Sequence, residues 1–302
     1  MTDAQRIVSL LPGATEWVCE LGLADRLVGI SHECDFPHHV TSLPRVSRSR
    51  IDSTKSSREI DEAVRSFSDA RTPLYELDAA TLASLQPDLI LTQTLCNVCA
   101  VSEQDVLNCI SGLEKNCSIL DLPARTFTDV FDDARAISEA TGETNASCVA
   151  IELMQARIDK VCHSVDQRMR PTVTLLEWLD PLFCSGHWTP QVIQWAGGVD
   201  PIGQVGQPSK LLSFEQLAVA DPDILLVACC GMDQHRTESE LAAVAGSQGW
   251  QQLKAVRSQQ VCTFDGSAFF NRPGPRLVDA LEAVAGIISR WHSGQRVEEH
   301  LG

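Results

Sequence analysis

Short apolar runs alternate with amphipathic runs along most of the chain, a pattern typical of α/β proteins. The apolar runs predict strands at residues 6–11, 26–31, 89–92, 118–122, 172–178, 224–229 and 260–264. Apolar residues at steps of three and four predict helices at residues 15–21, 127–141, 143–167, 190–196, 238–245 and 276–291. Thr15 is expected to cap the first helix after a turn at Pro12 and Gly13. The polar stretch at residues 47–71 predicts a surface loop leading into a helix.

One pattern occurs twice in the chain. Residues 82–91 and 217–226 each carry a Leu five positions before a Pro-Asp pair, and an apolar run follows. In both places a helix should end near the Pro-Asp turn and a buried strand of the parallel type should begin. The repeat favours two similar α/β lobes, at residues 1–142 and 171–302, joined by a long rigid helix within 143–170. A buried helix inside one large domain is the alternative.

The net charge and the length of the apolar runs exclude some binding partners and a membrane-spanning helix. The 302 residues carry 24 Lys and Arg against 40 Asp and Glu, a net charge of −16, which argues against nucleic-acid binding and against an anionic membrane surface. No apolar run approaches the length needed for membrane insertion. The first residues show no secretory signal pattern, so we expect a cytoplasmic protein, with the periplasm as the alternative. The 12 cysteines are then expected to be reduced.

Chemically versatile side chains follow the predicted strands, where ligands of open α/β sheets bind. After strand 26–31 come His32, Glu33, Cys34 and Phe36. Imidazole and thiolate together can ligate a transition metal, which makes Cys34 a candidate metal ligand, and His32, Glu33 and Phe36 are candidates for ligand binding. A solvated polar loop is the alternative.

Cysteines follow two further strands. Cys96 and Cys99 form a C-x-x-C pair after strand 89–92, and Cys230 follows strand 224–229. If these loops converge with Cys34, the four thiols can hold zinc or an iron–sulfur cluster. Packing of the thiols in the core is the alternative reading.

Aromatic and polar residues follow the strands of the second half. The ligand-binding candidates here are Trp178, His187, Trp188, Phe270, Asn271 and Arg272. The three large aromatic rings offer flat apolar walls, and Arg272 offers a partner for a carboxylate or phosphate. Aromatic residues near strand ends also commonly belong to the core.

Several catalytic signatures are absent from the sequence. It contains no G-x-x-x-x-G-K-[ST] phosphate loop, no G-x-S-x-G nucleophile elbow and no H-E-x-x-H zinc motif. No general acid–base pair can be assigned from the sequence, so the catalytic residues, if there are any, are unknown. Binding is therefore favoured over catalysis.

The chain resembles the iron-siderophore and cobalamin class of substrate-binding proteins. The resemblance is carried by residues 6–16, by residues 28–31, by the strand entry at Pro87 and Asp88, by the long helix and by residues 196–198. The S-H-E-C-D-F-P segment at 31–37, the Cys96 and Cys99 loop and residues 271–276 are similar to a subgroup labelled cobalamin-binding protein.

The resemblance implies two three-layer α/β lobes, one rigid connecting helix and a ligand cleft between the lobes. It also implies a large metal chelate as ligand and, for an exported protein, an ATP-binding-cassette permease as partner. Our first hypothesis is a soluble binding protein for cobalamin or a related corrinoid, with His32 or a thiol near the metal. A cytosolic protein with a cysteine-ligated zinc or iron–sulfur centre is the second, and a transport receptor is the third.

Overall fold

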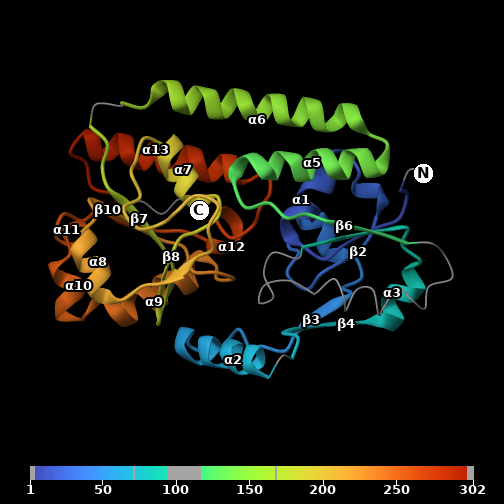
Figure 1. Cartoon of the computed structure of the whole chain (residues 1–302), viewed down its shortest axis with the longest axis horizontal. Helices are drawn as coiled ribbons and strands as arrows, with labels where there is room; N and C mark the ends of the chain where they lie inside the picture. The colour runs from blue at the N-terminus through green and yellow to red at the C-terminus, as the bar shows by residue number, and fades with distance from the viewer. Residues whose placement is uncertain (1–3, 71, 94–116, 167–168, 298–302) are drawn as a thin grey trace. The chain divides into compact units, whose positions relative to one another are not determined.

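The computed structural model describes residues 4–70, 72–93, 117–166 and 169–297 (Figure 1). Contacts between residues divide the chain into two units. The first holds the residues up to Lys55 together with Glu59–Ala124 and Thr128–Leu153. The second holds the short segments Ser56–Arg58 and Arg125–Phe127 and everything from Met154 onward. Each unit is an α/β structure built on its own sheet, as predicted.

The sheet of the first unit has four parallel strands in the order β2-β1-β5-β6. These strands are β1 (Ile7–Ser9), β2 (Leu27–Ile30), β5 (Leu89–Thr92) and β6 (Ser118–Asp121). A separate antiparallel pair is formed by β3 (Ser47–Ser49) and β4 (Tyr75–Leu77). The helices are α1 (Pro12–Glu20), α2 (Ser57–Asp69), α3 (Ala79–Leu85) and α5 (Phe127–Thr141), with 3-10 turns at η1 (Ala24–Arg26) and η2 (His38–Ser42).

Helix α1 begins earlier than the sequence predicts. Leu11 is the residue before the helix and Pro12 occupies its first turn, so Thr15 lies inside the helix and is not its cap. The Thr15 hydroxyl instead donates to the Leu11 carbonyl oxygen at 3.1 Å. Proline suits this position because its fixed φ is already helical and its missing N–H would have no partner in the first turn.

The sheet of the second unit has five strands in the order β11-β10-β7-β8-β9. The strands are β7 (Val173–Leu179), β8 (Leu182–Cys184), β9 (Lys210–Leu211), β10 (Ile224–Val227) and β11 (Val261–Thr263). Strands β11, β10 and β7 are parallel, whereas β8 and β9 continue the sheet in antiparallel fashion. The sequence pattern did not predict β8 and β9.

Helices cover this second sheet. They are α7 (Thr189–Trp195), α8 (Phe214–Ala220), α9 (Gln234–Ala245), α10 (Gln248–Gln252), α11 (Lys254–Arg257), α12 (Gly266–Phe269) and α13 (Leu277–His292). The amphipathic α13 buries one face, including Leu281, Val284 and Ile288, and packs beside α7 (Figure 1). The long helix α6 (Thr144–Ser164) corresponds to the predicted helix at 143–167, and the boundary between the units falls within it.

The repeated Pro-Asp segments have the same structural role in both units. In the first unit the Asp88 carboxylate accepts hydrogen bonds from the backbone N–H groups of Gln5 and Arg6, at 3.1 and 2.9 Å. In the second unit Asp223 accepts from the backbone N–H of Thr172 at 2.8 Å. Each aspartate therefore fixes the start of the neighbouring first strand, β1 or β7, against the strand that follows the aspartate.

Removing this carboxylate should destabilise the unit that contains it. We expect Asp88→Ala to lower the free energy of unfolding by about 1–2 kcal/mol, since hydrogen bonds to charged groups each contribute on the order of 1.5–3 kcal/mol. Urea unfolding followed by circular dichroism measures the change. Asp69→Ala, at the exposed end of α2, is the control. Equal stability of the two variants would contradict the assigned role.

Candidate functional site

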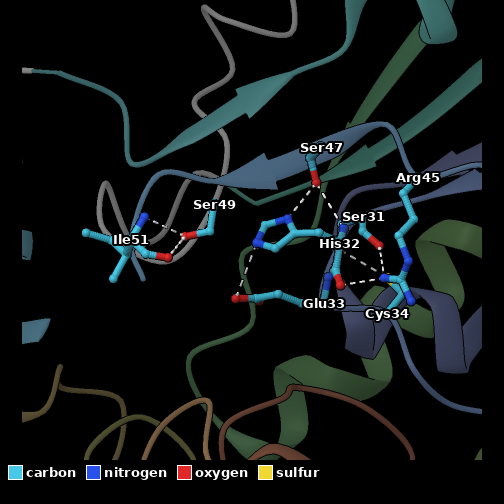
Figure 2. A network of polar contacts seen from close by, with 8 residues as sticks. All are labelled: Ser31, His32, Glu33, Cys34, Arg45, Ser47, Ser49 and Ile51. Atoms are coloured by element: carbon cyan, nitrogen blue, oxygen red, sulfur yellow. Dashed lines mark hydrogen bonds and ion pairs between the residues drawn. The ribbon is translucent and has the colours of Figure 1, made fainter. Parts of the chain in front are cut away.

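His32 lies just beyond the carboxyl end of β2 and is fixed by the neighbouring strand β3. The Ser47 hydroxyl oxygen is 2.8 Å from Nδ1 of His32 and accepts the His32 backbone N–H at 3.1 Å. The Tyr75 ring of β4 packs against the imidazole, with ring centroids 5.1 Å apart. Figure 2 shows the ring between the Ser47 hydroxyl and the Glu33 carboxylate. Because Ser47 fixes Nδ1, the ring presents Nε2 on its other side.

The surroundings of His32 favour its neutral form. Burial lowers the pKa of the imidazole, and the guanidinium of Arg45 lowers it further. Arg45 donates to the backbone carbonyl oxygens of Ser31 and His32, at 3.2 and 2.5 Å, so its charge is held beside the ring (Figure 2). Nε2 lies 3.8 Å from a Glu33 carboxylate oxygen and has no hydrogen-bond partner among the described residues. A neutral imidazole with one anchored nitrogen is the form that ligates metals.

A cavity of about 400 Å³ lies beside this network. Arg45 and Ser47, which contact His32, both line it. The remaining lining residues are Arg48, Glu76, Leu77, Asp78 and Ala79. A volume of 400 Å³ is at the low end of the range for small-molecule pockets, and the lining is mostly polar and charged. The cavity therefore suits a polar group of a ligand.

The predicted cluster of four thiols has no support from the described residues. Cys34 is fully buried and lies within hydrogen-bond distance of the hydroxyls of Thr15 and Ser31, at 3.0 and 3.1 Å. Cys230 is exposed, and Cys96 and Cys99 lie outside the described residues. Within residues 4–70, 72–93, 117–166 and 169–297, no three His, Cys, Asp or Glu side chains are placed to hold a metal ion. Cys34 therefore serves as a buried polar contact of α1.

In the second unit the loop between β8 and α7 presents His187. The backbone of His187 is left-handed, with φ at +51°, which is uncommon for a side chain other than glycine. Two backbone hydrogen bonds fix it, from His187 N–H to the Gln207 carbonyl oxygen and from Gly206 N–H to the His187 carbonyl oxygen. Non-glycine residues held in this conformation cluster at functional sites.

The His187 ring is half-buried and stacks on the next residue. Its centroid is 5.5 Å from that of Trp188. Burial lowers the pKa of His187, and the charge of Arg125 lowers it further. The imidazole is therefore neutral near pH 7, as in His32, and it makes no side-chain hydrogen bond to another described residue. Both units thus place a neutral imidazole in a loop that follows a strand.

A buried carboxylate supports the His187 loop. Glu177, near the end of β7, accepts hydrogen bonds from the Gly186 backbone N–H at 3.2 Å and from the Ser209 hydroxyl. A side chain at Gly186 would collide with the backbone of Gln207 and Ser209, so the close approach of the two segments requires glycine there. Burial raises the pKa of Glu177 to about 7. Glu177 was not a predicted site residue, although an acidic residue within an apolar strand was a visible signal of a buried polar role.

The other aromatic candidates are distributed between the surface and the core. Trp188 and Phe270 are buried, and the Trp188 indole N–H donates to the Phe270 carbonyl oxygen at 2.6 Å. Trp178 is half-buried at the end of β7, whereas Phe36 is 45% exposed. The role of Trp188 and Phe270 as ligand walls stays a prediction, and in this structure both rings pack among core residues.

Two polar candidates follow Phe270. Asn271 has a buried side-chain nitrogen with no hydrogen-bond partner among the described residues, and Arg272 is half-buried. An amide nitrogen without a partner is costly in a folded protein, which is why such groups commonly face a ligand or an ordered water. Their ligand-binding role also stays a prediction.

Comparison with known proteins agrees with this architecture. The sequence model of a family described as periplasmic binding protein matches residues 7–268. The chain belongs to the periplasmic binding protein family. The expected resemblance to this family is thereby confirmed, and so is the α/β fold with two lobes.

Relatives of this periplasmic binding protein carry informative names. The vitamin B12-binding protein of Vibrio cholerae is 26% identical over 286 residues, covering 93% of this chain and 88% of that protein. An uncharacterized ABC transporter substrate-binding lipoprotein of Bacillus subtilis is 21% identical over 295 residues, covering 94% and 79%.

Solved structures show the same fold. The periplasmic vitamin B12 binding protein of Vibrio cholerae superposes with a TM-score of 0.70 at 22% identity, covering 96% of this chain and 98% of the other. A periplasmic heme-binding protein of Roseiflexus superposes with a TM-score of 0.71 at 20% identity, covering 98% and 100%. The relatives are named as periplasmic or lipoprotein components, so the cytoplasmic expectation finds no support among them. Among the described helices, none is both long enough and apolar enough to cross a membrane.

The pKa of Glu177 gives the stability of this periplasmic binding protein a distinct pH dependence. A folded-state pKa of about 7, above the value near 4.3 expected after unfolding, means that folding favours the protonated acid. Its contribution to stability is complete below about pH 4 and is lost as pH rises through about 7. We therefore expect Glu177→Gln to gain stability relative to the native chain as pH rises from 5 to 8.

Urea unfolding at pH 5, 6, 7 and 8 measures this difference. Glu20→Gln on the exposed end of α1 changes the same charge outside the loop and should follow the native curve. If the difference in free energy of unfolding between Glu177→Gln and the native protein does not change with pH, burial does not raise the pKa of Glu177.

Proposed function

We propose that this chain binds a corrinoid, such as cobalamin or cobinamide, or a closely related tetrapyrrole metal chelate. The observation that carries the proposal is the imidazole of His32, which Ser47 anchors at Nδ1 beside a polar cavity of the first unit. The names of the Vibrio relatives, which match nearly the whole chain, point to the same ligand class.

Imidazole nitrogen suits the metal of such a ligand. Cobalt and iron in tetrapyrroles take ligands above and below the ring plane, and histidine is a common one. Ser47 holds Nδ1 of His32, whose buried Nε2 has no hydrogen-bond partner among the described residues, and His187 is held by its backbone. Each histidine would therefore supply a metal contact from its own unit.

Apolar and basic side chains complete the chemistry. Trp178, half-buried at the end of β7, and the exposed Phe36 offer flat faces to a macrocycle. Arg45 and Arg48 line the polar cavity beside His32, where Arg48 pairs with Glu76, and their remaining N–H groups suit the amide or phosphate groups at the edge of a corrinoid. These local positive charges lie in a chain whose net charge is −16.

The biological role proposed for the chain is delivery of this ligand to an ATP-binding-cassette permease from the periplasmic side. Support comes from the family match and from relatives named as substrate-binding components of ABC transporters. A cytoplasmic role and a resident zinc or iron–sulfur centre have no comparable support.

Direct binding tests the proposal. Titration with aquocobinamide, cyanocobalamin and haemin, followed by visible absorption and calorimetry, should reveal 1:1 binding of at least one of them. For a ligand with an open axial position, the absorption band should shift on binding. If a histidine contacts the metal, its replacement in His187→Ala or His32→Ala should abolish this shift of the absorption band. The same variant should bind the chelate about tenfold more weakly, a loss of about 1.4 kcal/mol.

His235→Ala, which removes an exposed histidine of α9, is the matched control and should bind like the native chain. Absence of binding to all three chelates would overturn the proposed function. Binding that is unchanged in both histidine variants would keep the ligand class but reject the histidines as metal contacts.

A further inference from the structure

The first residues of helix α2 belong to a different unit from the rest of that helix. Ser56–Arg58 group by their contacts with the second unit, whereas the chain up to Lys55 and from Glu59 onward groups with the first. The contacts of this segment are made with Trp178, Asp180 and Glu240, which lie more than 120 positions away in the sequence.

Arg58 makes a two-pronged ion pair with Asp180. Its Nε and Nη2 atoms donate to the two carboxylate oxygens, each at 3.0 Å. This geometry matches the planar fork of a guanidinium to the plane of a carboxylate. Both side chains are partly exposed, and an isolated pair of this kind contributes little to stability. The role considered for the Arg58–Asp180 pair is therefore to position neighbouring groups rather than to stabilise the fold.

Ser57 holds the same segment from its other side. The residue is 1% exposed, and its hydroxyl donates to the Glu240 carboxylate of α9. Arg236 also donates to Glu240, at 2.9 Å, which keeps that carboxylate in place. The backbone carbonyl oxygen of Ser57 accepts the indole N–H of Trp178 at 3.2 Å.

These contacts close into a ring around Trp178. Its indole N–H is shared between the carbonyl oxygens of Ser57 and Asp180, both at 3.2 Å. Arg58, which follows Ser57 in the chain, forms the ion pair with the Asp180 carboxylate. The ion pair therefore holds together the two carbonyl groups that fix the orientation of the indole.

We propose that Ser57 and Arg58 are positioning residues for Trp178, so that the start of α2 sets the affinity for the chelate to which the proposed function assigns this indole. The inference rests on the proposed function for the ligand, but the positioning itself can be measured without any ligand. Neither residue was a candidate in the sequence analysis, since nothing in a polar Ser-Arg pair marks a contact so distant along the chain.

Charge exchange across the ion pair tests the positioning. Arg58→Asp places two carboxylates together and should release the indole. The tryptophan emission should then shift to longer wavelength, and quenching by acrylamide should increase about twofold. In a Trp178→Phe background the same substitution should leave emission and quenching unchanged. The double exchange Arg58→Asp with Asp180→Arg restores opposite charges and should recover the native spectrum.

Arg65→Asp is the matched control, because Arg65 lies on the same helix and pairs with Asp61 at 2.7 Å. It makes the same change of charge and should leave the emission unchanged. If Arg58→Asp does not alter the emission, or alters it equally in the Trp178→Phe background, the positioning role is rejected.

Ligand binding then separates this inference from the proposed function. With aquocobinamide as the probe, Arg58→Asp should weaken binding about fivefold, while the double exchange and Arg65→Asp should stay within twofold of the native chain. Equal affinity of Arg58→Asp and the native chain would overturn the inference and leave the proposed function intact. No binding by the native chain would overturn the proposed function, and the emission result would still decide whether Trp178 is positioned.

Discussion

Parallel pairing at the centre of the first sheet is the constraint on which the His32 part of the candidate site depends, whereas the His187 loop follows the antiparallel strand β8. β1 lies between β2 and β5 in the first unit, and β10 lies between β7 and β11 in the second. Parallel strands end at the same edge, so the loops that follow them gather there. The carboxylates of Asp88 and Asp223 fix the starts of β1 and β7.

Hydrogen bonds hold the two histidines and Glu177 in place. The Ser47 hydroxyl holds one nitrogen of His32, while two backbone hydrogen bonds hold His187 in a strained conformation. Glu177 bridges the segments on either side of the His187 loop. Burial keeps both imidazoles neutral, and this is the chemical state in which they can meet a metal. The loops are thus built to present nitrogen atoms rather than charge.

The sequence predicted the parts of the fold that depend on continuous apolar runs. Short, buried apolar runs correctly predicted four parallel strands, which are β1, β5, β7 and β10. It did not predict β8 and β9, which have three and two residues and too little pattern to detect. The two Pro-Asp pairs marked the repeated architecture because both aspartates have the same hydrogen-bonding role.

The site was less predictable than the fold. An aromatic residue after a strand can face a ligand or the core, and the path of the loop decides which. The Trp188 indole N–H donates to the Phe270 carbonyl oxygen, and the Trp178 indole N–H donates to the carbonyl oxygen of Ser57, 121 positions away in the sequence. Such long-range contacts, like the carboxylate of Glu177 meeting Ser209, leave no local signal in the sequence.

Native mass spectrometry of the purified chain, incubated with an equimolar mixture of cobinamide, cobalamin, haemin and a ferric hydroxamate siderophore, decides whether the chain selects a tetrapyrrole chelate. The account predicts a single complex of one chain with one tetrapyrrole chelate, at a concentration where the siderophore remains free. A spectrum showing the chain alone, or the chain carrying only the siderophore, would contradict it.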